Sequence, residues 1–103
     1  MGRNNEKGTK EDLCRYRLEI SKADLRSAML LLEAGELRGA NNRAYYSIYH
    51  AISSVHALDG NAYKRHKDAL ANFNKAYVKT EIFSRELGRK ISEAVEIRHA
   101  SDY

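Results

Sequence analysis

Proline is absent from this sequence of 103 residues, and glycine occurs only six times. Because these two residues interrupt helices most strongly, their scarcity argues against a turn-rich sheet protein and favours long helices. Apolar residues make up 43% of the chain and charged residues 31%, and the length suits one domain with one modest core. We therefore expect a single all-α domain.

Cysteine and long apolar runs are also scarce. Cys14 is the single cysteine, so an intrachain disulfide is impossible. The sequence has no charged-then-apolar leader and no apolar run long enough for a bilayer, so we expect a cytoplasmic protein without membrane contact. HExxH motifs, paired cysteines, glycine-rich phosphate loops and serine or cysteine triad signatures are missing, so we expect no metal and no cofactor.

No block of like charge occurs either. Eighteen Lys and Arg against fourteen Asp and Glu give a formal net charge of +4, and these residues are spread along the whole chain. Such a balance permits binding of nucleic acid without arguing for it. The plainer interpretation is a solvated helical surface of mixed charge.

The first half of the chain predicts a tail and a helix. Residues 1–8 (MGRNNEKG) are polar and lack apolar periodicity, so we expect a flexible tail before a helical domain over residues 9–103. Thr9, followed three residues later by an aspartate, resembles a helix N-cap, and apolar residues at helical spacing continue the helix to about residue 34. Gly35 is placed where a left-handed C-cap is needed.

Three more helices are expected after that glycine. One covers residues 37–58, and its apolar stripe is expected to pack on the first helix; the stripe consists of Leu37, Ala40, Ala44, Ile48, Ala51, Val55 and Leu58. Another covers about residues 64–78, with Leu70, Phe73 and Tyr77 on one face. Ser84 is a plausible N-cap for a last helix, which continues to the end of the sequence.

Arg43 and His50 are the candidate chemical groups of the second helix. They are seven residues apart, which is two turns or roughly 10.5 Å along the axis, and so project from one face. Tyr46 lies at the margin of this face, which also carries the small residues Gly39, Ser47, Ser54 and Ala57. Small side chains let another helix approach closely. We expect the helix that packs on this face to be the second helix of another copy of the chain.

Two copies packed antiparallel about a two-fold axis would bring Arg43 of one chain to His50 of the other. Such a cleft suits cleavage of RNA, because Arg stabilises phosphate charge, His moves protons near neutral pH and the ribose 2′-OH is the nucleophile. The alternative is structural: Arg43 pairs with a carboxylate and His50 fills a polar interface. Spacing alone does not choose between them.

Three segments add context. Residues 42–51 (NRAYYSIYHA) resemble the NRAYY-x-x-[FY]-HA signature of the HEPN family, the higher eukaryote and prokaryote nucleotide-binding domain. Residues 64–67 (KRHK) and 73–80 (FNKAYVKT) resemble the family's KxHK and F-x-K-x-[FY]-VKT stretch, and residues 98–103 (RHASDY) match a later RHxADY-like segment.

The resemblance implies an up-and-down antiparallel four-helix bundle that dimerises, here without a final helix usual in the family. It also implies an R-x(4–6)-H motif that acts as a metal-independent ribonuclease in active members, with Arg43 and His50 at the motif positions. Many members are toxins paired with a small nucleotidyltransferase antitoxin, and others are inactive binding modules. The chain departs from active members at Ala44, where a polar residue is usual, and has Ile52 where modified toxins carry a tyrosine.

The remaining candidates are residues that would bind RNA or a nucleotide beside this pair; they are Asn42, Tyr46, Ser47, Arg98 and Asp102. Arg98 and Asp102, four residues apart, form either a surface ion pair or a brace for the cleft. His66 and His99 lack partners at metal-ligand spacing. Three functional hypotheses follow: a ribonuclease, a non-catalytic module that binds a nucleotide, RNA or a nucleotidyltransferase, and a structural dimer.

Overall fold

Helices account for nearly all of the regular structure in residues 8–101, which are the residues that the computed structural model describes. The predicted tail lies outside these residues, apart from Gly8. The elements follow the chain as α1 (Lys10–Glu33), α2 (Leu37–Leu58), α3 (His66–Phe73), the π-helical segment η1 (Asn74–Val78) and α4 (Arg85–Ser101). The all-α prediction is confirmed. None of these helices is both long and apolar enough to cross a membrane.

The capping residues set the helix boundaries much as the sequence predicts. Thr9 and Asp12 form a reciprocal capping box, in which each side chain accepts the other's backbone N–H at 3.1 Å. Gly35 has a φ of 80° and turns the chain from α1 into α2. Ser84 Oγ accepts the backbone N–H of Leu87 at 3.1 Å, which makes it the cap of α4.

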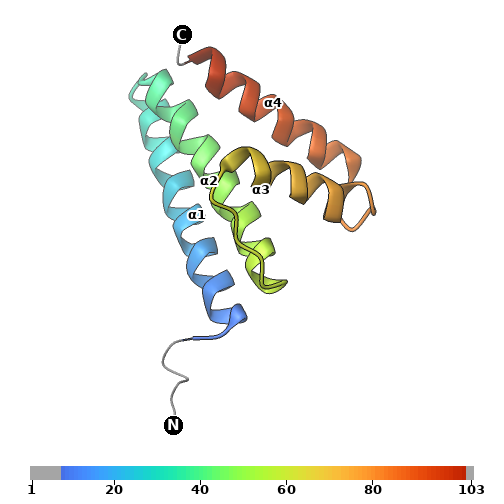
Figure 1. Ribbon diagram of the computed structural model, residues 1–103. Helices are drawn as coiled ribbons and strands as arrows, with labels where there is room; N and C mark the ends of the chain where they lie inside the picture. Colours follow the sequence, from blue (N-terminus) through green and yellow to red (C-terminus); the bar gives the residue numbers. More distant parts are fainter. Residues whose placement is uncertain (1–7, 102–103) are drawn as a thin grey trace.

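In space, α1 and α2 form an antiparallel pair, α3 lies across α2, and α4 packs on α2 and on η1 (Figure 1). The core lies where α2 meets α3, η1 and α4. Its buried side chains are Ile52, Phe73, Tyr77 and Val78, and Ile48, Val55, Leu70, Phe83 and Ile91 pack against them. The predicted apolar face of the third helix is confirmed. That helix begins at His66, and its last turn is π-helical rather than α-helical.

The apolar stripe of α2 was expected to pack on α1, and this expectation is wrong. Ile48 and Val55 from the middle of the stripe pack into the core formed with α3, η1 and α4. Leu37 and Leu58 at its ends are 60% and 46% exposed. The middle of the stripe therefore faces α3, η1 and α4 rather than α1.

The small-residue face of α2 is covered by α1 of the same chain rather than by a second copy. Ser21 and Ser47 exchange hydrogen bonds between the helices: Ser21 Oγ donates to Ser47 O at 2.6 Å, and Ser47 Oγ donates to Ser21 O at 2.8 Å. A Cβ at Gly39 would lie 3.3 Å from Leu31 Cδ1. Ser54 and Ala57 are also buried. The sequence correctly predicted that a helix packs closely on these small residues. That helix is α1 of the same chain and not α2 of a second copy.

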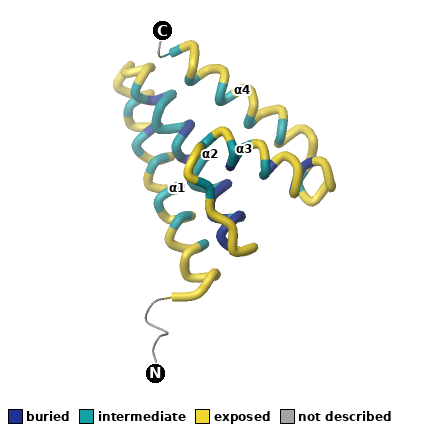
Figure 2. The backbone as a smooth tube through the Cα atoms, in the orientation of Figure 1, coloured by how far each residue is buried: buried dark blue, intermediate teal, exposed yellow. Residues whose placement is uncertain are grey.

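The leucine-rich side of α1 faces solvent. Leu25, Met29 and Leu32 are between 50% and 59% exposed, whereas Ser21 and Ala28 are the buried residues of this helix. Figure 2 shows the resulting contrast between exposed α1 and the buried positions along α2. The α1–α2 contact is therefore built from small and polar side chains.

Candidate active site

Arg43 and His50 lie at the edge of the α1–α2 contact, and one carboxylate of α1 reaches both. Arg43 Nη1 donates to Asp24 Oδ1 at 2.9 Å, and His50 Nε2 lies 3.7 Å from Asp24 Oδ2. The Asp24 side chain is 13% exposed, whereas those of Arg43 and His50 are 37% and 30% exposed. The predicted pair therefore shares one buried counter-ion and keeps open surface toward solvent.

Tyr46 lies between these two groups. The Arg43 guanidinium lies over the Tyr46 ring at 5.0 Å, and the ring centroids of Tyr46 and His50 are 6.1 Å apart. A cation held over an aromatic face is restrained in direction as well as position. Tyr46 thus contacts both members of the predicted pair on the side that is open to solvent.

Arg98 reaches the same face from α4. Its Nε donates to Asn42 Oδ1 at 3.1 Å, and its guanidinium lies 4.5 Å from the Tyr45 ring centroid and 5.4 Å from that of Tyr46. The structure therefore brings together Arg43, His50, Tyr46, Asn42 and Arg98, which the sequence had selected from positions up to 56 residues apart. Two guanidinium groups border one aromatic surface.

Two other selected residues are placed differently. Ser47 is 8% exposed, and its hydroxyl is used between α1 and α2, so the structure does not bring it to this face. Asp102 lies outside the described residues. The proposed brace between Arg98 and Asp102 stays a prediction.

His66 joins the cluster from the start of α3. Its Nδ1 lies 2.9 Å from Tyr45 Oη, and its ring stacks on Tyr49 with centroids 3.8 Å apart. Burial lowers the pKa of His66 below its usual 6.5, and the charges of Arg98 and His50 lower it further. Burial likewise raises the pKa of Tyr45. A histidine kept neutral near pH 7 therefore borders the site.

Neither Asp24 nor His66 was selected from the sequence. Asp24 has no motif around it, and only the α1–α2 packing reveals its partners. His66 had a signal, because it lies in the KRHK run that resembles a family segment. Its spacing from other candidate ligands bears only on a metal site. Among the described residues, no three His, Cys, Asp or Glu side chains are grouped as they would be around a metal ion.

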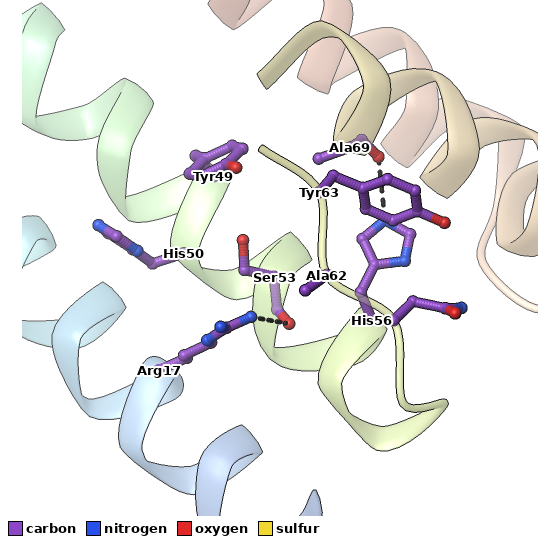
Figure 3. A pocket seen from close by; sticks show the side chains of 9 residues that line it. Arg17, Tyr49, His50, Ser53, His56, Ala62, Tyr63 and Ala69 are labelled. Carbon is purple, nitrogen blue, oxygen red and sulfur yellow. Dashed lines mark hydrogen bonds between the residues drawn. The ribbon is translucent and has the colours of Figure 1, made fainter. Parts of the chain in front are cut away.

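A pocket of about 180 Å³ opens beside His50. Figure 3 shows Arg17 of α1 on one side and His56 with Tyr63 on the other. Arg17 Nη1 donates to Ser53 O at 3.4 Å, and His56 Nε2 donates to Ala69 O at 2.9 Å. Within residues 8–101, His56 Nδ1 is buried without a hydrogen-bond partner. The pocket continues the polar surface beyond the predicted pair.

Comparison with known proteins identifies relatives of this chain. The model of the HEPN domain matches residues 14–103. A "UPF0332 protein" of Thermotoga maritima is 33% identical over 94 residues, which cover 91% of this chain and 71% of the relative. A "UPF0332 protein" of Pyrococcus horikoshii is 31% identical over 77 residues, covering 75% of this chain and 54% of the relative.

A third relative carries a functional name. It is a Methanocaldococcus jannaschii protein named "Putative toxin", and it is 28% identical over 86 residues, covering 84% of this chain and 64% of the relative. The chain thus spans between about half and about three quarters of these relatives. No solved structure matches the chain.

Proposed function

We propose that this chain, which belongs to the HEPN domain family, is a metal-independent ribonuclease whose catalytic residues are Arg43 and His50. The observation that carries the proposal is the gathering of these two side chains on one open face, oriented by the shared carboxylate of Asp24. Positioned groups of this kind are what acid–base cleavage of RNA requires.

Each neighbouring group has a role in the proposed reaction. Arg43 binds the scissile phosphate and stabilises the charge that develops on it, and His50 transfers a proton. Arg98 adds a second cation for the RNA backbone, and Asn42 orients it through the 3.1 Å hydrogen bond. Tyr46, over whose ring both guanidinium groups lie, holds these two cations toward the substrate. The ribose 2′-OH is the nucleophile, which restricts the substrate to RNA.

The biological setting is also part of the proposal. One relative is named "Putative toxin", and we infer a toxin role here, in a pair with a small nucleotidyltransferase antitoxin. Dimerisation stays a prediction, and it would have to use the edge of α2 that α1 leaves open, where the side chains of Arg43 and His50 are 37% and 30% exposed. A cytoplasmic location also stays a prediction. The position at which modified toxins carry a tyrosine is Ile52, which is 2% exposed in the core. Modification by an antitoxin at that position is therefore not expected.

Cleavage of a labelled structured RNA in EDTA tests the activity. Wild-type protein should cut, and His50→Ala should not, at equal helical content and equal oligomeric state. His99→Ala is the matched control, because His99 is an exposed histidine of α4 outside the cluster. Absence of cutting by the wild-type protein across several RNAs would overturn the ribonuclease proposal.

A second candidate function is a non-catalytic module that binds RNA or a nucleotide through the same face. The ion pair favours it, because Asp24 already neutralises Arg43, and Ala44 replaces the polar residue usual in active members. Titration of a fluorescent RNA separates the two functions. A binding module would show saturable, salt-dependent affinity for RNA without any product.

A further inference from the structure

Cleavage of RNA by its own 2′-OH requires two proton transfers. One group accepts the proton of the 2′-OH, and another donates a proton to the leaving 5′ oxygen. The pair Arg43 and His50 supplies only one such group in each chain. The two-fold arrangement expected from the sequence would obtain the second histidine from another copy.

The structure holds a second histidine at this face within the same chain. The rings of Tyr46 and Tyr49 lie between His50 and His66 and contact both. Tyr46 is 6.1 Å from His50 and 5.6 Å from His66, and Tyr49 is 5.8 Å from His50 and 3.8 Å from His66, measured between ring centroids. The two imidazoles thus border the same two tyrosine rings.

The hydrogen bonding of His66 leaves one nitrogen available. Its Nδ1 is engaged with the hydroxyl of Tyr45 at 2.9 Å. Among residues 8–101, no hydrogen-bond partner is found for its Nε2, and the residue is half-buried rather than enclosed. Stacking on Tyr49 fixes the plane of the ring. A substrate hydroxyl could therefore approach Nε2 along a defined direction.

We propose that His66 is the second proton-transfer residue, so that one chain carries a complete set of His50, His66 and Arg43. This inference rests on the proposed ribonuclease function and deepens it. It also changes the expected role of dimerisation, which is no longer needed to supply a histidine.

The step balances without any further reactant. In the tautomer in which Nδ1–H donates to Tyr45 Oη, neutral His66 accepts the 2′-OH proton at Nε2. The 2′ oxygen forms a bond to phosphorus while the bond from phosphorus to the 5′ oxygen breaks. Protonated His50, with Asp24 as its counter-ion, gives its proton to the 5′ oxygen. The products are a 2′,3′-cyclic phosphate and a 5′-hydroxyl. Arg43 and Arg98 neutralise the non-bridging oxygens throughout.

The surroundings of His66 suit the role of base. The titratable and charged groups that face it are Tyr45, Tyr46, Tyr49 and His50 from α2 and Arg98 from α4. Neither α2 nor α4 offers it a carboxylate. Burial and the two cations keep its pKa low, so the ring is neutral at the pH at which it must accept a proton.

The first test compares His66→Ala with His50→Ala and the control His99→Ala, using a short labelled RNA between pH 5 and pH 9. His66→Ala should lose roughly 10²–10⁴-fold in rate, as removal of a general base does. It should also lose the acidic limb of the pH profile, and added imidazole should restore part of the rate. A merely structural histidine would show neither the altered profile nor the rescue.

The outcomes separate the two proposals. If His50→Ala abolishes cleavage but His66→Ala keeps the wild-type rate and pH profile, the role of His66 is refuted and the ribonuclease proposal stands. If the wild-type protein does not cleave, or His50→Ala cleaves as well as wild type, both fail. A lower rate in His66→Ala that imidazole does not rescue, with a pH profile that keeps its acidic limb, would also overturn the inference.

A mixing experiment tests whether one chain is sufficient. His50→Ala and His66→Ala proteins are unfolded together in equal amounts, refolded and assayed. If both histidines of a site come from one chain, the mixture stays inactive. If they come from two chains, about a quarter of the wild-type rate returns, because half of the reassorted dimers are mixed and each holds one intact site. Such recovery would refute the single-chain site.

Discussion

Replacing Asp24 by Asn tests whether this carboxylate organises the site. The change keeps the shape of the side chain but removes the charge shared by Arg43 and His50. Hydrogen bonds to buried charged groups contribute about 1.5–3 kcal/mol, whereas exposed ion pairs contribute about 0.2–1 kcal/mol. With Asp24 13% exposed and Arg43 37% exposed, the pair lies between these cases. We expect a loss of about 1–2 kcal/mol in the free energy of unfolding.

That loss should lower the melting temperature by about 4–16 °C, since 1 kcal/mol corresponds to about 4–8 °C in a domain of this size. Urea unfolding followed by circular dichroism measures the loss in the free energy of unfolding. Glu19→Gln is the matched control, because it removes the same charge from α1 at a side chain that is 64% exposed. The control should change stability by no more than about 0.5 kcal/mol.

The same variant should separate binding from chemistry. Freed from its counter-ion, Arg43 should bind RNA more tightly, while the less oriented His50 should transfer protons more slowly. We therefore expect a lower KM and a lower kcat for Asp24→Asn. Wild-type stability together with wild-type kcat and KM would refute the view that Asp24 holds the pair. A double-mutant cycle with Arg43→Gln should give a coupling energy of about 0.5–3 kcal/mol.

Three further predictions follow from individual contacts. Arg98→Gln should raise the pKa of His66 and move the acidic limb of the pH profile to higher pH. The pKa should return only part of the way to its usual value, because burial, the larger cause of its lowering, remains. NMR titration of the histidines measures the shift. Ser47→Arg should unfold the monomer rather than only disturb a dimer, because Ser47 is 8% exposed against α1; circular dichroism decides this. Burial and the Asp59 carboxylate raise the pKa of Tyr77 from 10.0 to about 12. The free energy of unfolding should therefore fall as pH rises from 10 to 12. Unfolding curves of Tyr77→Phe at alkaline pH should lack this decrease.

The helix boundaries could be predicted because local chemistry sets them. Thr9, Gly35 and Ser84 act through hydrogen bonds or backbone angles within a few residues of themselves, so a short sequence window contains the cause. The partner of each helix face depends instead on competition between distant surfaces. The stripe through Ile48 and Val55 could have packed on either side of α2, and its position follows only from the assembled α3, η1 and α4.

The same distinction explains the site. Arg43 and His50 share a helix face, so their alignment follows from spacing alone. Positions 43, 47, 50 and 54 all lie on one strip of α2, whose small members are buried against α1 and whose two titratable members lie at its edge. Asp24 could not be found in this way, because it lies 19 residues from Arg43 and no local pattern marks it.

The least packed helix supplies one of the two arginines at the site. No residue of α4 is buried. Its contacts include Ile91 packed against the core, the hydrogen bond from Arg98 to Asn42, the hydrogen bond from Asn41 to Ser101 at 2.7 Å, and the close approach of Gly88 to Val78. Small interfaces open at low free energy. Since Arg98 also lowers the pKa of His66, movement of α4 would change both the charge of the RNA-binding face and the protonation of the proposed base. A partner that binds α4 could therefore regulate cleavage without touching Arg43 or His50.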